Sequence, residues 1–205
     1  MEGYRGRWRC SVLAWCVLGM AAVLSGCGGS GDVVIQQGTV SRGSSTPEGV
    51  SWNFGEKKVT LNVKAAPDLN FWEGQSHTVL LCVYQLSDMI SFKQFSAKEE
   101  GLLKLLRCES FDATVKQFNR HVISPGQVSS LVYDRMEGTR YVGLVAGFNK
   151  LDPAGSARTW SVPLTTKTKG WVFRDTYYYP APLDMAIMLG ADSIQKSGDK
   201  TGDKP

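Results

Sequence analysis

The residue whose neighbours most clearly specify its chemistry is Cys27. It follows Leu24, Ser25 and Gly26, and these four residues have the pattern of a bacterial lipobox. A signal peptidase needs small side chains beside the bond that it cleaves, and Ser25 and Gly26 supply them. The thiol of Cys27 would receive diacylglycerol, and cleavage would leave it as the first residue. The motif therefore predicts lipidation at Cys27.

The residues before Cys27 have the organisation of a secretory signal peptide, which we assign to 1–26. Three arginines and one acid precede the uncharged apolar run 10–24. This run is shorter than the ~20 residues that a membrane-spanning helix needs. The alternative is an ordinary signal peptide followed by a chance cysteine. Because Gly28 and Gly29 replace the aspartate that tends to retain enterobacterial lipoproteins at the inner membrane, we expect an outer-membrane anchor that faces the periplasm.

Two further cysteines, Cys82 and Cys108, remain in the chain after the lipidated one. An exported protein enters a compartment that permits disulfides, so an even pair can be joined. The sequence leaves two states open, a Cys82–Cys108 disulfide and two buried free thiols.

No other residues have a spacing typical of catalysis or of metal binding. The sequence lacks the G-x-S-x-G, C-x-x-C, H-E-x-x-H and P-loop patterns. Its two histidines, His77 and His121, lie far apart, and we interpret both as structural or solvated. We expect no enzyme activity, metal, cofactor or small-molecule substrate. A net charge of +4 without a long run of Lys or Arg also argues against a nucleic-acid partner.

Short apolar segments predict a mainly β fold. Segment 58–66 alternates apolar and polar residues, which indicates a half-buried strand, and 78–86 is apolar nearly throughout, which indicates a central strand covered on both faces. Further strands are expected at 127–134, 140–149, 159–164, 171–179 and 184–189. We expect 127–134 and 140–149 to form a hairpin and the aromatic segment 171–179 to pack in the core. Many short strands between turns are typical of a β-sandwich.

One segment has helical periodicity instead. Residues 96–99 resemble a capping box and leucines follow on one stripe, so we expect a helix at about 97–107. The stretch 111–123 fits either a second helix or a strand. The prediction is therefore a sandwich with one or two added helices.

The composition divides the chain into four parts. After the signal peptide 1–26 we expect the lipidated cysteine and a flexible, glycine-rich tether over 27–56, and then a sandwich domain over 57–195. The tail 196–205 has no apolar side chain to bury and is expected to be disordered.

The connection between the first two predicted strands is the candidate binding site. It is long for a hairpin loop, where about 2–5 residues are usual, and it carries large apolar side chains. Aromatic residues contribute strongly to interfaces, so we interpret the loop as a partner-binding element. The alternative is that Phe71 and Trp72 fold back as a lid on the sandwich. The candidate residues are Pro67, Asp68, Leu69, Asn70, Phe71, Trp72, Glu73, Gly74, Gln75 and Ser76.

The order of several motifs resembles a known family. The lipobox cysteine is followed by VTLNVKAAPDLN at 59–70, TVLLCVYQLSDMISF at 78–92, ISPGQ at 123–127 and YVGLVAGFNKLDPAGSARTWSVPL at 141–164. This order is similar to that of the type VI secretion lipoproteins, the TssJ family, also called SciN or VasD. The chain departs from the family in having Ser161 where a Trp-Arg pair is common, and in the segment beyond 164, which we cannot align.

The resemblance implies a transthyretin-like β-sandwich anchored in the outer membrane. It also implies a partner, the periplasmic domain of the inner-membrane protein TssM, within the complex that spans the envelope. In the family the loop between strands one and two is the contact element, and it corresponds here to 67–76. A periplasmic ligand- or glycan-binding lipoprotein that uses the 171–179 face is the alternative, and an envelope hydrolase is a third possibility.

Overall fold

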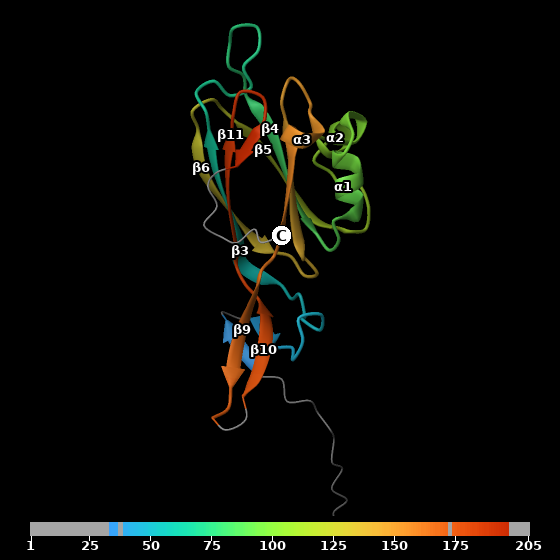
Figure 1. Cartoon of the computed structure of the whole chain (residues 1–205), viewed down its shortest axis with the longest axis vertical. Helices are drawn as coiled ribbons and strands as arrows, with labels where there is room; N and C mark the ends of the chain where they lie inside the picture. The colour runs from blue at the N-terminus through green and yellow to red at the C-terminus, as the bar shows by residue number, and fades with distance from the viewer. Residues whose placement is uncertain (1–32, 37–38, 172–173, 197–205) are drawn as a thin grey trace, which may run out of the picture. The chain divides into compact units, whose positions relative to one another are not determined.

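The computed structural model describes residues 33–36, 39–171 and 174–196 (Figure 1). The predicted signal peptide, Cys27 and nearly all of the predicted tail lie outside the described residues.

Two four-stranded sheets form a β-sandwich, which confirms the predicted fold class. The first sheet has the order β12-β11-β3-β6, with β3 at Gly55–Ala65, β6 at Val128–Arg135, β11 at Leu183–Leu189 and β12 at Ile194–Lys196. The second has the order β5-β4-β7-β8, with β4 at Val79–Leu86, β5 at Val115–Ile123, β7 at Tyr141–Gly147 and β8 at Ala157–Ser161. In these two sheets β3 and β11 run parallel and the other neighbours are antiparallel.

Strand β4 is buried on both faces, as its continuous apolar sequence predicted. Leu81 and Val83 point into the core between the sheets, which they share with Leu61 of β3. Tyr84 and its neighbours on the opposite face pack under a helical layer. Because each face meets a different apolar cluster, β4 is apolar at nearly every position.

The helical layer consists of α1 at Ile90–Ser96 and α2 at Glu99–Leu105, which cover the outer face of the second sheet (Figure 1). The expected helix at 97–107 corresponds to α2, whereas α1 was not predicted. The expected capping box does not form, because Lys98 is the N-cap and the Ser96 hydroxyl donates to the carbonyl of Lys93. A third helix, α3 at Pro153–Ser156, is a single turn, and the ambiguous stretch 111–123 contains β5.

The predicted hairpin of 127–134 with 140–149 is wrong. Strand β6 pairs with β3 and β7 pairs with β4, so the chain crosses from one sheet to the other between them. The side chain of Gln85 fixes this crossing. Its Nε2 donates to Gln117 Oε1 at 2.8 Å and to the carbonyl of Asp134 at 2.7 Å, and its Oε1 accepts from Met136 N and Thr139 Oγ1. The segment between β6 and β7 is therefore held by the buried, fully hydrogen-bonded amide of Gln85, where the sequence suggested a hairpin turn.

The predicted tether is too long, because folded structure begins well before residue 57. Strands β1 at Val33–Gln36 and β2 at Thr39–Arg42 pair with each other. Val50 is buried and Trp52 packs against the sandwich core. The guanidinium of Arg135 donates to the carbonyl of Asn53 at 3.1 Å, which holds the entering chain against the end of β6.

The predicted strand 171–179 is also revised. Strands β9 at Leu164–Lys169 and β10 at Asp175–Pro180 form a separate two-stranded sheet. Trp171 lies in the connection between them and is 93% exposed, so it is not a core residue. Tyr179 is buried, and it packs so closely on Gly43 that a Cβ there would lie 2.5 Å from the ring. The base of this hairpin is thereby attached to the entering chain.

Candidate partner-binding loop

Loop 67–76 joins β3 to β4 and extends beyond the ends of the strands (Figure 1). Its base is fixed to two neighbouring connections. The backbone N–H groups of Asn70 and Phe71 donate to the carbonyls of Gly190 and Ala191, in the turn between β11 and β12. The loop is therefore part of a surface built by several connections at one end of the sandwich.

Leu69 and Asn70 position the loop from inside. The side chain of Leu69 is completely buried in the core. Asn70 has a φ of 47°, in the left-handed region that asparagine tolerates better than most residues, and it is only 8% exposed. Its Oδ1 accepts from the N–H of Asn149 at 2.7 Å and its Nδ2 donates to the carbonyl of Thr78 at 3.3 Å. These two predicted site residues hold the loop and are too buried to contact a partner directly.

The tip of the loop is a tight turn. Trp72 and Gln75 exchange backbone hydrogen bonds of 2.9 and 3.0 Å. Glu73 and Gly74 between them have φ values of 49° and 77°, as a two-residue type I′ turn requires. The Ser76 hydroxyl closes the loop at its base by donating to the carbonyl of Pro67 at 2.9 Å. The backbone of the loop is therefore ordered by its own hydrogen bonds before any partner arrives.

Two large aromatic side chains are presented by this ordered backbone. Phe71 is 54% exposed and Trp72 is 46% exposed. The Trp72 ring leans on the ring of His77, with their centroids 6.1 Å apart, and His77 Nδ1 lies 3.3 Å from the carbonyl oxygen of Asn70. The rings therefore do not fold back as a lid on the sandwich. They form an apolar contact surface on a rigid support.

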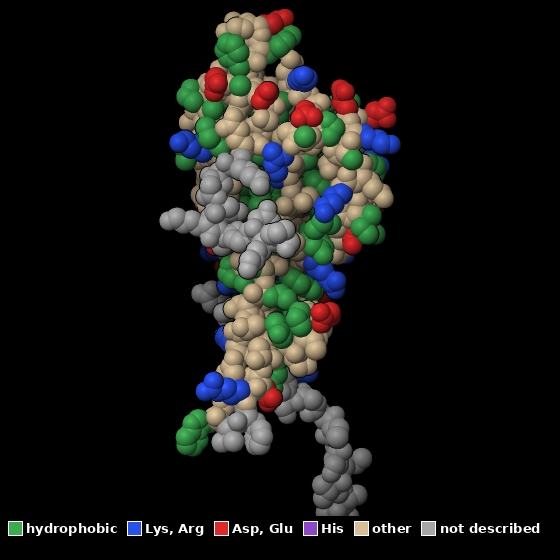
Figure 2. Space-filling model, viewed as in Figure 1, with side chains coloured by type: hydrophobic (Ala, Val, Ile, Leu, Met, Phe, Trp, Pro, Cys, Tyr) green, Lys and Arg blue, Asp and Glu red, His purple; other side chains and the backbone are tan. Residues whose placement is uncertain are grey.

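The surroundings of the aromatic pair are acidic. Asp68 and Glu73 lie in the loop itself and are exposed. Asp152 and Asp192 lie in the two connections that hold the loop, where Lys150 is the opposing charge. Figure 2 shows acidic side chains gathered around this end of the molecule. A partner surface with basic residues around an apolar pocket would complement it.

The connections that flank the loop were missed by the sequence reasoning. Gly190 and Asp192 have the residue types of a turn, so a turn after β11 could be expected. That this turn meets loop 67–76 follows from the parallel pairing of β11 with β3, from Leu183 beside Val59 to Leu189 beside Ala65. No local pattern in the sequence indicates such a long-range pairing.

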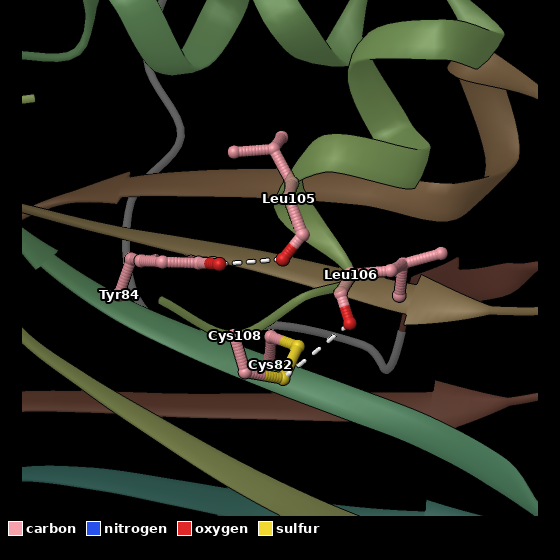
Figure 3. Close-up of a disulfide and its surroundings, with 5 residues drawn as sticks. All are labelled: Cys82, Tyr84, Leu105, Leu106 and Cys108. Carbon is pink, nitrogen blue, oxygen red and sulfur yellow. Dashed lines mark hydrogen bonds between the residues drawn. A yellow bond between two sulfur atoms is a disulfide. The ribbon is translucent and has the colours of Figure 1, made fainter. Parts of the chain in front are cut away.

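The two cysteines of the body are joined in a disulfide, one of the two states that the sequence left open (Figure 3). It links β4 to the segment just after α2, with Cα atoms 5.3 Å apart. Nearby, the hydroxyl of Tyr84 donates to the carbonyl of Leu105 at the end of α2, and burial raises the pKa of Tyr84 to about 12. Both links hold the helical layer on the second sheet, away from the binding loop.

Within the described residues, no group of three or more His, Cys, Asp or Glu side chains is placed to hold a metal ion. None of the helices described here is both long and apolar enough to cross a bilayer.

Comparison with known proteins gives one family and several similar structures. Residues 57–191 match the family model described as type VI secretion lipoprotein, VasD, EvfM and TssJ. The fold is similar to the type VI secretion lipoprotein TssJ1 from Pseudomonas aeruginosa, with a TM-score of 0.52, 22% identity and coverage of 72% of this chain and 99% of that one. It is also similar to Serratia marcescens Lip, a membrane-bound component of the type VI secretion system, with a TM-score of 0.53, 18% identity and coverage of 70% and 99%. A search of curated protein sequences finds no match.

Proposed function

Because the chain belongs to the type VI secretion lipoprotein family, we propose that acyl chains on Cys27 hold it at the outer membrane while loop 67–76 binds the periplasmic domain of TssM. Its work is then to tether one membrane component to another during assembly of the complex across the envelope. No chemical step is required of it.

The observation that carries this proposal is the exposure of Phe71 and Trp72 on a backbone that is already ordered. Aromatic side chains dominate the energetics of many interfaces. A loop that is fixed before binding loses little conformational entropy when its partner docks. The acidic side chains around the pair add charge selectivity.

The position of the loop suits a tether. The entering chain meets β3 at Gly55, and loop 67–76 leaves β3 after Ala65. Gly55 and Ala65 are the two ends of β3, so the entry of the chain into the sandwich and loop 67–76 lie at opposite ends of that strand. A short anchored chain also keeps the loop at high local concentration near the membrane, so modest intrinsic affinity suffices.

Replacing Trp72 by alanine tests the loop. With 46% of a side chain of about 250 Å² exposed, roughly 110 Å² remains to be buried by a partner, which contributes about 2.5–3 kcal/mol. Trp72→Ala should therefore raise the dissociation constant for the TssM periplasmic domain roughly 100-fold in calorimetric titrations. The matched control is Phe118→Ala, because Phe118 on β5 is 43% exposed and lies outside the loop.

Both variants should keep the thermal midpoint of the parent, since each removes a partly exposed ring. An unchanged dissociation constant for Trp72→Ala, or an equal loss for Phe118→Ala, would remove the loop from the proposal.

The anchor is tested separately with Cys27→Ser. Without the thiol no diacylglycerol can be attached, so the folded body should leave the outer-membrane fraction on cell fractionation. Its affinity for the TssM domain in solution should be unchanged, because the thiol lies far from the loop in the chain. Recovery of the variant in the outer membrane would contradict lipid anchoring through Cys27.

A further inference from the structure

The distal part of the β9–β10 hairpin is uncovered by the rest of the described chain. Lys167, Lys169 and Arg174 are exposed, and Trp171 at the connection is 93% exposed. An isolated two-stranded hairpin is at best marginally stable in water, so this one depends on its base, where Tyr179 is buried. Tryptophan side chains are highly buried on average in folded proteins, so an indole that is 93% exposed is an exception to that tendency.

The charges of this end are mainly positive. Asp175 is the single acid between Leu164 and Pro180, against Lys167, Lys169 and Arg174. The amino group of Lys167 lies 5.6 Å from the centroid of the Tyr179 ring, so its stem runs along the hairpin. The hairpin therefore combines an exposed indole with an excess of cations, whereas the binding loop at the other end of β3 is acidic.

The segment that pairs with this hairpin follows Cys27 closely in the sequence. Ser44 exchanges backbone hydrogen bonds of 3.2 and 2.8 Å with Tyr178 of β10. Just before it, Arg42 of β2 pairs with Val33 of β1. Cys27 precedes Val33 by only six residues, which span at most about 20 Å when fully extended. A lipid attached at Cys27 would therefore be joined to β1 by a short stretch of chain.

We propose that Trp171, Lys167, Lys169 and Arg174 form a docking surface for an anionic phospholipid bilayer. The inference rests on the proposed acylation of Cys27, which would bring that bilayer within reach. Tryptophan is enriched at the level of lipid headgroups, and each Lys or Arg near an anionic surface adds to the attraction. Acyl chains alone attach the protein to the membrane at one point. The hairpin, as a second contact, would fix the orientation of the sandwich relative to the membrane. The aromatic loop beyond Ala65 is then directed away from the membrane.

The test uses the lipidated protein reconstituted in phosphatidylethanolamine vesicles that contain phosphatidylglycerol with brominated acyl chains. Bromine quenches the fluorescence of a tryptophan that enters the headgroup region. Flotation of the vesicles first measures anchoring, and quenching in the floated fraction then measures docking of the hairpin. Trp171→Phe should remove most of the quenching. The matched control Trp72→Phe, at the opposite end of β3, should leave it unchanged.

The charge contribution is tested with Lys169→Gln/Arg174→Gln. Removing two cations should lower the ratio of docked to undocked hairpins roughly 30-fold, from about fivefold per charge. The control pair Lys93→Gln/Lys98→Gln removes two exposed cations from the helical layer and should have no effect. Replacing phosphatidylglycerol by brominated phosphatidylcholine should lower the quenching of the parent protein in the same way.

The outcomes separate the two proposals. Failure to float contradicts the anchor and with it the proposed function. Flotation with quenching that Trp171→Phe does not change overturns the hairpin docking alone. Equal quenching in phosphatidylcholine vesicles overturns the requirement for an anionic surface. A different pair of results would identify a glycan as the ligand and overturn the lipid proposal. The parent would bind peptidoglycan, Trp171→Phe would abolish that binding, and no quenching would be seen in vesicles.

Discussion

Removal of the Cys82–Cys108 disulfide should destabilise the body by several kcal/mol. The bridge closes a loop with a sequence separation of 26 residues. The loss of loop-closure entropy in the unfolded chain for such a loop corresponds to about 3.5 kcal/mol at 25 °C. For a domain of about 150 residues this lowers the thermal midpoint by roughly 7–14 °C. We expect this loss for Cys82→Ala/Cys108→Ala.

Equilibrium unfolding in urea, followed by far-ultraviolet circular dichroism, measures the effect. The proteins compared should all lack residues 1–26 and carry Cys27→Ser, so that neither lipid nor a third thiol intervenes. Unfolding of the parent in the presence of dithiothreitol is the matched comparison, because it breaks the same bond without removing the sulfur atoms. The double alanine variant and the reduced parent should have similar free energies of unfolding.

A loss below about 1 kcal/mol would refute the entropic reasoning. It would mean that contacts of this cluster, formed by Phe92, Leu102 and Tyr84 with the bond from Tyr84 to Leu105, persist in the unfolded ensemble. The disulfide would then add little further restriction to the unfolded chain. Affinity for the TssM domain should be unaffected in either case, because the bridge does not hold loop 67–76. A large loss of affinity would extend the binding surface to the helical side.

Two further predictions concern buried polar groups. Gln85→Leu leaves Met136 N and Thr139 Oγ1 without their acceptor. We therefore expect the free energy of unfolding, measured in urea titrations, to fall by about 2–4 kcal/mol. A near-neutral result would contradict the role of Gln85 in the crossing. Partial burial lowers the pKa of His121, whose Nε2 lies 2.7 Å from the hydroxyl of Tyr133. Below the ordinary pKa of histidine the unfolded state therefore binds the proton more readily, and stability falls as the pH drops from 7 toward 5.5. His121→Gln should remove that part of the pH dependence, and an identical dependence in the variant would assign it to other groups.

The elements that could be predicted from sequence are those whose burial depends on local periodicity. The alternation of β3 and the continuous apolar run of β4 reflect one and two covered faces, and both strands were identified. Helix α1 was missed because Phe92 is its one fully buried residue and no side-chain cap marks Met89. The Asp88 carboxylate accepts a hydrogen bond from Ile90 N at 2.7 Å, a turn-forming contact that the sequence interpretation did not use.

The elements that were misjudged depend on long-range pairing. Gly138 makes the segment between β6 and β7 look like a hairpin turn, yet Gln85, far away in the sequence, binds that segment and directs the chain into the other sheet. The same limitation affected Trp171. Its aromatic neighbours suggested a core strand, but whether a hairpin packs on a sandwich depends on surfaces that the local sequence does not describe.

The candidate site shows the same division between local and long-range information. The aromatic pair and the length of the loop made 67–76 the candidate binding site from sequence alone, and partner binding there stays a prediction. The separation of roles within it needed the structure, because burial assigns Leu69 and Asn70 to positioning and leaves Phe71 and Trp72 for contact. The bond from Asn149 N to Asn70 Oδ1 joins residues 79 positions apart, so no inspection of the loop by itself could reveal it.

Strand β3 connects these observations into one mechanical account. At its beginning lie the hydrogen bond from Arg135 to Asn53 and the basic hairpin, and at its end lies the acidic, aromatic loop. A flexible leash of about thirty residues would let the body rotate freely and would spread the loop over many orientations. Strand structure is already present at Val33, within the region predicted as a tether. In the two proposals made above, the hairpin contact would limit rotation of the body, and the aromatic loop would then face away from the lipid, toward the proposed inner-membrane partner.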